Sequence, residues 1–416
     1  MQTQRLSRFV LAMSGAAALA GCGGSQPPIV APGAMPLGNA IARAASAYRV
    51  LHRFNGHRVG GYDPVAPLID VKGTLYGTNV HGGSYGYGTV YSINARGVKK
   101  TLHDFHGGSD GANPISGLVD VNGTLYGTTK RGGTDCYQSD QRCGTVFAIT
   151  TSGHEEVIYD FKGGSDGGAP VAGLVYVNGL LYGTTLEGGA YGSGTVFSIS
   201  TRGSESLLHS FGKGSDGWDP LWGDLIDVNG TLYGTTDQGG SAGLGVVYSI
   251  TPNGNYKVLH EFTGGSDGSH PDAALIDVGG TLYGTTTFGG GLGCRTKNFP
   301  DCGTLFAVTT KGKENVLYDF TNADGGAWDP RGGLTELNGT FYGTTMYGGA
   351  SQCGARTGYG CGTVYSVSMS GAEQVLHSFT GGGTDGANPV ATLLDVKGTL
   401  YGTTQRAPGT VFALTP

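Results

Sequence analysis

The stretch Gly123-Thr124-Leu125-Tyr126-Gly127-Thr128-Thr129 decides the fold, because close variants of it occur seven times along the chain. The tyrosines of the copies are Tyr76, Tyr126, Tyr182, Tyr233, Tyr283, Tyr342 and Tyr401, and successive copies are separated by 50, 56, 51, 50, 59 and 59 residues. A period of this length belongs to propeller blades rather than to short solenoid repeats. The sequence therefore predicts seven similar structural units.

Each unit contains four short apolar runs separated by turn residues. In the second unit the runs are 117–121, 124–128, 145–150 and 155–161. The first two are joined by Asn122-Gly123, and the same dipeptide recurs at Asn178-Gly179, Asn229-Gly230 and Asn338-Gly339. Both residue types tolerate positive φ angles, so this is the strongest short signal for a β-hairpin. Four antiparallel strands in each of seven units predict an all-β, seven-bladed β-propeller.

The two ends of the repeat region predict how the ring closes. The region begins with a lone run of the fourth type, residues 48–54, and ends with a lone run of the third type, residues 409–414. Pairing of these two runs would complete the last blade and leave no open sheet edge. A parallel solenoid would instead need atypical polar caps at both ends, and neither end carries one. We therefore expect the N-terminal strand to close the ring.

Composition excludes several other classes of protein. Glycine accounts for 81 of the 416 residues, against a usual share of about 7%, while Asp, Glu, Lys and Arg make up 13%. Collagen is excluded because there is no Gly-X-Y period, and a helical bundle is disfavoured because each interior glycine costs about 1 kcal/mol. The 22 tyrosines and 15 phenylalanines provide a core that a disordered chain lacks. The net charge of −6 is spread without a basic stripe, so no nucleic-acid partner is expected.

The N-terminal region predicts export and membrane anchoring. Residues 1–21 combine a basic start with a short apolar run, as in a signal peptide, and the run is too short to span a bilayer. The sequence Leu19-Ala20-Gly21-Cys22 resembles the bacterial lipobox, in which cleavage precedes the cysteine and acyl chains are attached to it. We expect a lipoprotein signal peptide over 1–21, the lipidated Cys22 and a flexible tether over 22–47, and the propeller over 48–416. The alternative is an ordinary signal peptide with a coincidental cysteine.

These features place the protein in the bacterial cell envelope, lipid-anchored on the extracytoplasmic side, at the outer membrane or the periplasmic face. The membrane is then a partner through the lipid chains, which contribute about 0.8 kcal/mol for each buried CH₂ group. We expect a monomer.

The other six cysteines form three close pairs, Cys136 with Cys143, Cys294 with Cys302, and Cys353 with Cys361. The second cysteine of each pair directly precedes a Gly-Thr strand start, so the pairs occupy equivalent loops. An oxidising compartment favours three disulfides, each worth about 2 to 3 kcal/mol. Zinc is the alternative, but the spacings and histidine partners of zinc ribbons and fingers are absent.

The repeat resembles that of the tandem GloVer-repeat proteins, whose hallmark is Gly-Thr-Leu-Tyr-Gly-Thr-Thr, then a Gly-Gly doublet, then Gly-Thr-Val-Phe. Here the hallmark comprises residues 123–129, 132–133 and 144–147, and the resemblance covers about residues 48–416. Unit one departs with Asn79 for the second threonine, and unit seven reads Gln405-Arg406-Ala407-Pro408 without the doublet. The resemblance implies an extracellular protein with one of several surface anchors, and it implies no activity and no catalytic residues.

Alternating strand direction places every long insertion on one face of the predicted propeller, so we place any functional site there. The recurring segment that begins as Gly107–Gly111 matches the G-x-S-x-G nucleophile elbow, but it lacks the strand-to-helix context and is interpreted as a turn. Its aspartates could ligate calcium, although the spaced ligands of an EF-hand loop are missing. They are Asp110, Asp166, Asp216, Asp267 and Asp385.

Five histidines share one repeat position, which is a tyrosine in two other units. They are His52, His103, His209, His260 and His377, with Tyr159 and Tyr318. Because these histidines would lie on the outer strands of different blades, they cannot converge on one metal, and we expect them to serve in packing. No metal and no cofactor are expected.

Residues that break the repeat are the candidates for a ligand site. After the loop proline before the first strand, five units carry an aliphatic residue, whereas the other two carry Asp272 and Arg331. Unit four adds Trp218, Trp222 and Asp224, and unit six adds Trp328. Indole, carboxylate and guanidinium groups at the mouth of the central channel would suit a sugar or peptide ligand. Tryptophan packing between blades and a structural ion pair are the alternative.

The sequence favours a membrane-anchored binding or scaffold module for a glycan, peptide or protein, and it identifies no catalytic residue. An exported carbohydrate-active hydrolase or lyase is the second hypothesis. Glycoside chemistry needs two carboxylates about 5 to 10 Å apart, and Asp224 with Asp272 is the one pair outside the repeat that we can nominate. A purely structural role in the envelope is the third hypothesis.

Overall fold

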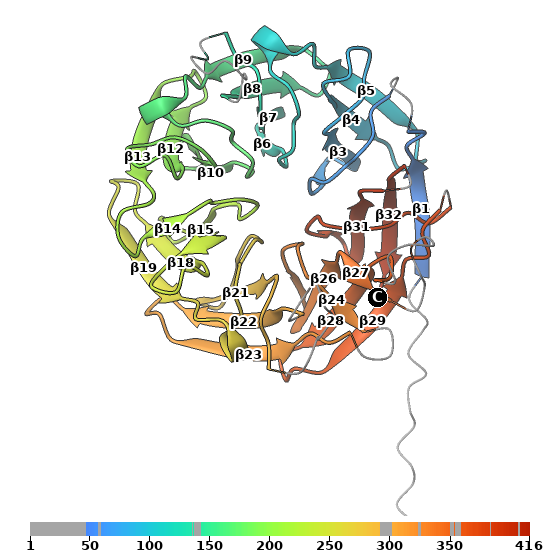
Figure 1. Cartoon of the computed structure of the whole chain (residues 1–416). Helices are drawn as coiled ribbons and strands as arrows, with labels where there is room; N and C mark the ends of the chain where they lie inside the picture. Colours follow the sequence, from blue (N-terminus) through green and yellow to red (C-terminus); the bar gives the residue numbers. More distant parts are fainter. Residues whose placement is uncertain are drawn as a thin grey trace, which may run out of the picture. The chain divides into compact units, whose positions relative to one another are not determined.

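The computed structural model describes residues 47–56, 60–134, 136, 143–291, 302–322, 326–349, 353, 359–382, 384–406 and 408–416. Residues 45–416 form one compact unit, in which seven four-stranded antiparallel sheets surround a central axis (Figure 1). The predicted seven-bladed propeller is therefore confirmed. The expected signal peptide, Cys22 and tether lie outside the described residues. No helix of the described part is long and apolar enough to cross a membrane.

Each blade adds its strands in chain order from the channel outward, and the last blade takes its outermost strand from the start of the domain. Blade 1 contains β2 (Ile69–Val71), β3 (Thr74–Asn79), β4 (Thr89–Ile93) and β5 (Lys99–Asp104); blade 2 contains β6 (Val119–Val121), β7 (Thr124–Thr129), β8 (Thr145–Thr150) and β9 (Glu155–Asp160). Blade 3 contains β10 (Val175–Val177), β11 (Leu180–Thr185), β12 (Thr195–Ser200) and β13 (Glu205–Ser210); blade 4 contains β15 (Ile226–Val228), β16 (Thr231–Thr236), β18 (Val246–Ile250) and β19 (Tyr256–Glu261). Blade 5 contains β20 (Ile276–Val278), β21 (Thr281–Thr286), β22 (Thr304–Thr309) and β23 (Glu314–Asp319); blade 6 contains β25 (Thr335–Leu337), β26 (Thr340–Thr345), β28 (Thr363–Ser368) and β29 (Glu373–Ser378). Blade 7 contains β30 (Leu394–Val396), β31 (Thr399–Thr404), β32 (Thr410–Thr415) and β1 (Ala47–Arg53).

Short elements occupy the loops that connect these strands. Two-residue strands pair as β14 (Gly217–Trp218) with β17 (Gln238–Gly239) and as β24 (Ala327–Trp328) with β27 (Tyr347–Gly348). Three copies of the Gly-Ser-Asp segment form the 3-10 turns η1 (Gly108–Asp110), η2 (Gly164–Asp166) and η3 (Gly265–Asp267). The interpretation of this segment as a turn is therefore confirmed at these three copies.

The hairpin between the first two strands of each blade follows from its dipeptide. Asn122 and Gly123 have φ angles of 55° and 88°, as the tightest hairpin turns require. The Gly123 N–H also donates to a carboxylate oxygen of Asp120 at 2.8 Å. This fixed turn pairs Val121 with Thr124 and so sets the register of the blade.

The glycine of each Tyr-Gly-Thr phrase lies under an aromatic ring of the next strand. Gly127 pairs with Phe147 across β7 and β8, and a Cβ atom on Gly127 would lie 2.7 Å from the Phe147 ring and 2.8 Å from Leu118. The same pairing holds for Gly77 with Tyr91, Gly183 with Phe197, Gly234 with Tyr248, Gly284 with Phe306, Gly343 with Tyr365 and Gly402 with Phe412. All seven rings are fully buried. The repeat is therefore a packing rule, because any side chain at the glycine would displace the ring.

The two threonines of the phrase make different hydrogen bonds. The second threonine bonds to the third strand of its own blade where that strand begins with threonine, as Thr129 does to Thr145 at 2.9 Å. The first donates to a backbone carbonyl of the next blade's loop, as Thr78 does to Ser116 at 3.1 Å. Asn79, the departure in unit one, replaces the second threonine and donates to Thr89 at 3.0 Å. The bonds of the first threonine connect neighbouring blades, whose facing side chains form the hydrophobic clusters of the core.

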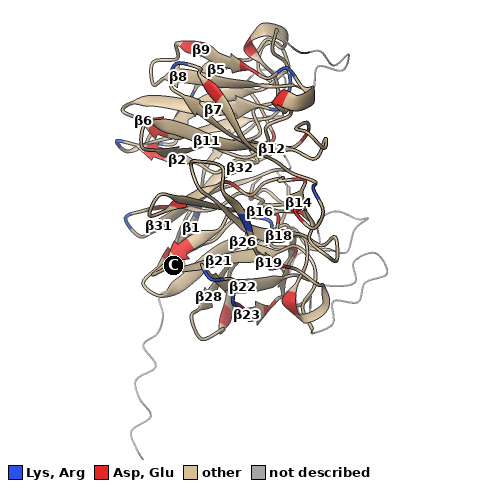
Figure 2. Cartoon of the chain, turned by 90° about the vertical axis from the view of Figure 1, so that its left-hand side faces the viewer, with Lys and Arg blue, Asp and Glu red and all other residues tan. Residues whose placement is uncertain are grey.

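Charged residues are few and dispersed over the ring. Asp, Glu, Lys and Arg make up 13% of the chain. On the side shown in Figure 2, acidic and basic residues are scattered over strands and loops instead of gathering in one patch of a single sign. A place where several charged groups converge is therefore worth examining as a site.

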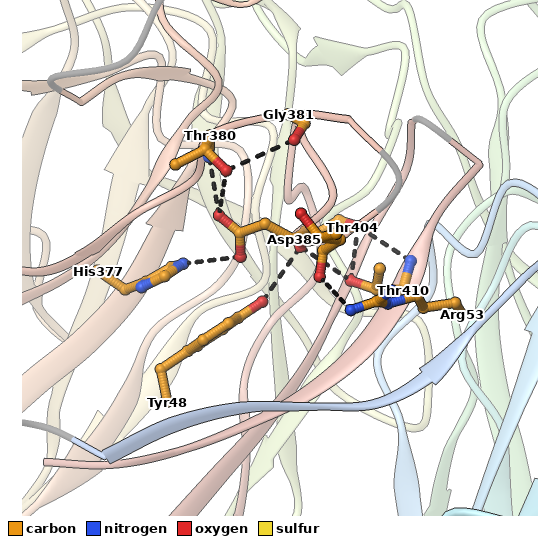
Figure 3. A network of polar contacts seen from close by, with 9 residues as sticks. Tyr48, Arg53, His377, Thr380, Gly381, Asp385, Thr404 and Thr410 are labelled. Carbon is orange, nitrogen blue, oxygen red and sulfur yellow. Dashed lines mark hydrogen bonds and ion pairs between the residues drawn. The ribbon is translucent and has the colours of Figure 1, made fainter.

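The ring closes as the sequence predicts, through pairing of β1 with β32. Tyr48 on β1 stacks on the ring of His377 from blade 6, with centroids 3.6 Å apart, and donates to the backbone carbonyl of Asp385 at 3.1 Å. Arg53 donates to the carbonyl of Thr384 at 2.8 Å. Figure 3 shows these side chains meeting around Asp385. The N-terminal strand is thus held by blade 6 and by the loop that follows it, as well as by β32.

Disulfides occur where the cysteine spacing predicts them. Cys136 is bonded to Cys143 and Cys353 is bonded to Cys361. Cys302 is also disulfide-bonded, and its predicted partner Cys294 lies outside the described residues. Each bond links a long loop to the start of a third strand.

Candidate functional site

The central channel is lined by the loops that lead into the innermost strands, and all seven blades contribute to it. Its narrow part encloses about 30 Å³, which is room for only about two water molecules. Most of its lining consists of aliphatic residues and glycines, together with Trp222, Asp224 and Arg331. The repeat-breaking residues of units four and six therefore meet at the channel.

A wider pocket of about 190 Å³ adjoins this narrow part. Its apolar wall is formed by Val65, Val390, Met346 and the indole of Trp222. Its polar groups are Gln405 and two arginines, Arg331 and Arg406. We call this space the mouth pocket. It is smaller than the pockets of drug-sized ligands, which measure about 300 to 1,000 Å³, so it suits a group the size of a single ring.

Arg331 is held in place by a buried carboxylate. Its Nε donates to Asp329 at 2.9 Å, and the Asp329 side chain is only 2% exposed, compared with 33% for Arg331. Burial lowers the pKa of Arg331, but the carboxylates of Asp329 and Asp272 outweigh it and raise this pKa overall. The guanidinium therefore stays charged while one side of it remains accessible from the pocket.

The second arginine has a different origin. Arg406 is exposed and occupies in unit seven the repeat position of Arg131 in unit two, directly before the Ala407-Pro408 pair that replaces the Gly-Gly doublet. Burial raises the pKa of Tyr347, and the positive charges of Arg331 and Arg406 both oppose that rise. Both guanidiniums therefore lie near the same hydroxyl, and together they give the mouth pocket a positive edge.

Asp224 lines the narrow channel, where it is partly buried. It accepts a hydrogen bond from the backbone N–H of Gly173, and burial raises the pKa of its carboxyl to about 6. Unit four carries one additional residue before its first strand. Thr184, whose counterparts donate to the next blade's loop, has no hydrogen-bond partner there among the described residues. The insertion thus replaces a bond between blades by a carboxylate in the channel.

Asp272 lies behind the channel wall. Its side chain accepts from Thr287 at 3.1 Å, and it shares a hydrogen bond with Asp237. Burial, then the Asp237 charge, raise its pKa well above the usual range, while Arg331 acts against that rise. The charges of Asp272 and Arg331 thus interact across adjacent blades. Asp272 lines neither pocket, however, and the direct ion pair of Arg331 is with Asp329.

The other two tryptophans do not reach these spaces. Trp328 on β24 is 4% exposed, and its ring packs 4.8 Å from Tyr347 and 5.6 Å from Tyr359. Trp218 on β14 is 41% exposed and lines neither the narrow channel nor the mouth pocket. Of the six candidate residues, the structure therefore gathers Trp222, Asp224 and Arg331.

The histidines and aspartates of the repeat are partners of one another. The histidine on the outermost strand approaches the aspartate of the following Gly-Ser-Asp turn, and Tyr159 does the same with Asp166. The histidine pairs are His103 with Asp110, His209 with Asp216, His260 with Asp267 and His377 with Asp385. These histidines therefore pack with a polar contact. Their partners are the aspartates that the sequence offered as possible calcium ligands.

Sequence reasoning missed three residues of the mouth pocket, namely Met346, Gln405 and Arg406. Gln405 and Arg406 directly precede the Ala407-Pro408 pair that replaces the Gly-Gly doublet of unit seven, so this departure lies beside them without marking either residue itself. Met346 follows the second threonine, a position that varies among units, so its sequence carried no signal.

Comparison with known proteins identifies the family. Residues 40–185 and 133–357 match the Gloeobacter/Verrucomicrobia repeat. Solved structures of similar fold include the computationally designed protein Ika8, with 12% identity, a TM-score of 0.47 and coverage of 87% of this chain and 98% of that one. A candidate 6-phosphogluconolactonase from Bacteroides uniformis has 14% identity and a TM-score of 0.49, and the match covers 80% of this chain and 89% of that one. A candidate gluconolactonase has 11% identity and a TM-score of 0.41, and the match covers 89% of this chain and 92% of that one. These likenesses carry no argument about activity. No curated protein matches the chain. Since the matched stretches together span more than half of the sequence, the chain belongs to the Gloeobacter/Verrucomicrobia repeat family, as its Gly-Thr-Leu-Tyr-Gly-Thr-Thr phrase predicted.

Proposed function

We propose that the protein is an envelope-anchored binding module whose mouth pocket holds a carboxylated sugar ring at the end of a glycan. The observation that carries this proposal is the convergence of the Trp222 indole with the Arg331 and Arg406 guanidiniums on one pocket of about 190 Å³. An indole offers a flat apolar surface for a sugar ring. Guanidiniums bind carboxylates through charge-assisted hydrogen bonds. The two together select an acidic ring over a neutral one.

A binding role is favoured over hydrolysis by the positions of the two nominated carboxylates. Asp224 lines the narrow channel, whereas Asp272 lies behind the wall and is engaged with Thr287 and Asp237. A glycosidase needs both carboxyl groups to face the scissile bond. The exported hydrolase or lyase therefore stays the alternative, and release of reducing ends from a bound oligosaccharide would favour it.

The binding proposal is tested with oligosaccharides that end in a hexuronic acid and with matched oligosaccharides that end in the neutral hexose. We expect the acidic ligand to bind at least about tenfold more tightly, since a hydrogen bond to a charged group contributes about 1.5 to 3 kcal/mol. Trp222→Ala and Arg406→Gln are each expected to weaken this binding by about tenfold or more. Isothermal calorimetry measures both effects. Arg331 is left intact, because its removal would leave the buried Asp329 carboxylate unpaired.

The matched control is Arg131→Gln. Arg131 forms the same isolated β-bridge in blade 2, with Ala112, that Arg406 forms in blade 7, with Ala387. It does not line the mouth pocket, so its variant should bind as the wild type does. Equal affinity for acidic and neutral ligands, or unchanged binding by Arg406→Gln in a protein with an unchanged melting temperature, would refute the proposal.

Anchoring at the envelope is supported by the lipobox-like Leu19-Ala20-Gly21-Cys22 and the apolar run before it. Acylation of Cys22 would place the propeller on the membrane through the tether of residues 22–47. Metabolic labelling with a radioactive fatty acid is expected to mark the wild-type protein and leave Cys22→Ser unlabelled in the soluble fraction. Equal labelling of the two proteins would exclude Cys22 as the attachment site.

A further inference from the structure

A second group of ligating side chains lies at the outer rim, between blades 1 and 2. His103 on β5, His106 and Asp110 place one ligand atom each within 4.8 Å of the others. The Nε2 atom of His103 lies 3.2 Å from Asp110 Oδ2, and the Nδ1 atom of His106 lies 2.9 Å from the same oxygen. The three residues are brought together by the tight η1 turn, in which Asp110 also accepts the backbone N–H of His106 at 2.9 Å.

The neighbouring blade contributes a fourth group. Glu155, at the start of β9, has a side chain that is only 10% exposed, and its Oε2 lies 3.9 Å from His103 Nε2. Its other oxygen, Oε1, is buried and has no hydrogen-bond partner in the described structure. A buried carboxylate oxygen without a partner is costly. The same oxygen is also unpartnered in the described structure at the equivalent residues Glu205, Glu314 and Glu373, so it is a feature of the repeat. What Glu155 adds at this seam is a carboxylate close to His103.

The donor set matches the preferences of zinc-class ions. Imidazole nitrogens and carboxylate oxygens bind Zn²⁺ at about 2.0 to 2.2 Å, which places neighbouring tetrahedral ligands about 3.3 Å apart. The spacings around Asp110 Oδ2 are 3.2 and 2.9 Å. Two neutral imidazoles with the carboxylates of Asp110 and Glu155 would also balance the charge of a divalent ion.

Comparison with the other blades shows which of these four residues recur as part of the repeat and which are particular to this seam. The histidine and aspartate pair recurs around the ring, so His103 and Asp110 alone indicate only a rim contact. The seam between blades 4 and 5 even repeats three of the four groups: His260 on β19, Asp267 in the loop that follows, and Glu314 on β23, whose carboxylate interacts with Asp267. The position of His106 there is Thr263. His106 is therefore the residue that converts the rim contact into a ligand set.

We infer that His103, His106 and Asp110, supported by Glu155 from the next blade, form a binding site for a zinc-class divalent transition metal at the seam between blades 1 and 2. The metal would bridge the two blades through their outermost strands. Exposure of His106, whose side chain is 53% exposed, leaves the site open to exchange with solvent. This site is independent of the mouth pocket, and its failure would leave the binding proposal intact.

The inference is tested by titrating untagged full-length protein with Zn²⁺ and, separately, with Co²⁺. We expect one zinc ion per chain and a Co²⁺ complex with the intense visible absorption of tetrahedral coordination. His106→Thr reproduces Thr263, the residue at this position after blade 4, and should lower zinc affinity by about tenfold or more. Glu155→Gln should weaken binding less, because it removes a charge and keeps the side-chain size.

The gain-of-function variant is Thr263→His, which adds the missing ligand beside His260, Asp267 and Glu314. It should raise the stoichiometry from one zinc ion per chain to two. Unchanged zinc affinity in His106→Thr, or absence of saturable binding in the wild type, would overturn the inference. Melting temperatures of the apo proteins show whether each variant is folded.

Discussion

Replacing Tyr48 by alanine is expected to lower the free energy of unfolding by about 3 kcal/mol, at the lower end of the range for buried aromatic truncations. Tyr48 lies on the strand that closes the ring, where its ring stacks on His377 and contacts Phe379 and Phe412. Its hydroxyl also donates to the Asp385 carbonyl, a bond that the variant loses. Urea denaturation of the purified protein measures the change.

The seam at blade 7 differs from the others because its outermost strand, β1, is not joined along the chain to the other strands of its blade and is held there by non-covalent contacts. Tyr256 makes the corresponding stack on His209, with centroids 4.0 Å apart, but it lies on a strand whose chain continues from the same blade. Tyr256→Ala should therefore cost a similar free energy, whereas only Tyr48→Ala should also accelerate hydrogen exchange of the β32 amides that pair with β1. Arg49→Ala, at an exposed position of β1, is the control and should change neither. Equal β32 protection in Tyr48→Ala and wild type would argue against β1 as the closing strand.

The architecture was predictable because the same packing requirement recurs in every unit of the sequence. Each Tyr-Gly-Thr glycine makes room for one buried ring, as Gly127 does for Phe147, and seven repetitions of that rule can only build seven similar sheets. The lone runs at the two ends each lacked a partner strand, which predicted that they pair, and β1 does pair with β32. Periodicity therefore predicts which strand a residue occupies and how far from the axis it lies.

The candidate site was only partly predictable, because breaking the repeat does not determine where a side chain points. Trp328 and Trp222 both break it, yet Trp328 belongs to a two-residue strand that turns its ring toward Tyr347 and Tyr359, whereas Trp222 lines the pocket. Arg331 and Asp272 occupy the same repeat position in neighbouring units, but the direct ion pair of Arg331 is with Asp329, two residues earlier. Such choices depend on local loop geometry that no spacing along the chain encodes. The proposed metal site did not emerge from the repeat for a related reason, since His106 lies outside the shared histidine position.

The stability difference between Asp224→Asn and the wild type is expected to rise by about 2 kcal/mol between pH 4 and pH 7. Burial raises the pKa of Asp224 from 3.8 to about 6 in the folded protein. Between these two values the unfolded chain ionises the carboxyl while the folded protein still holds the proton. Wild-type stability from this group therefore falls as pH rises from about 4 to about 6 and stays low above it, whereas the amide does not titrate.

Urea denaturation of both proteins at four pH values between 4 and 7 isolates this effect, because all other titrating groups are common to the pair. Asn keeps a carbonyl oxygen for the Gly173 N–H, so the hydrogen bond survives. Asp224→Ala removes that acceptor and should be destabilised, relative to Asp224→Asn, by a similar amount at every pH. A difference between Asp224→Asn and the wild type that is flat with pH would show that the carboxyl is not strained in the channel. A rising difference would mean that the inserted residue of unit four lowers stability at neutral pH to keep a negative charge beneath the mouth pocket. A local loss of stability of this kind is expected at a residue kept for function and not at a residue kept for packing.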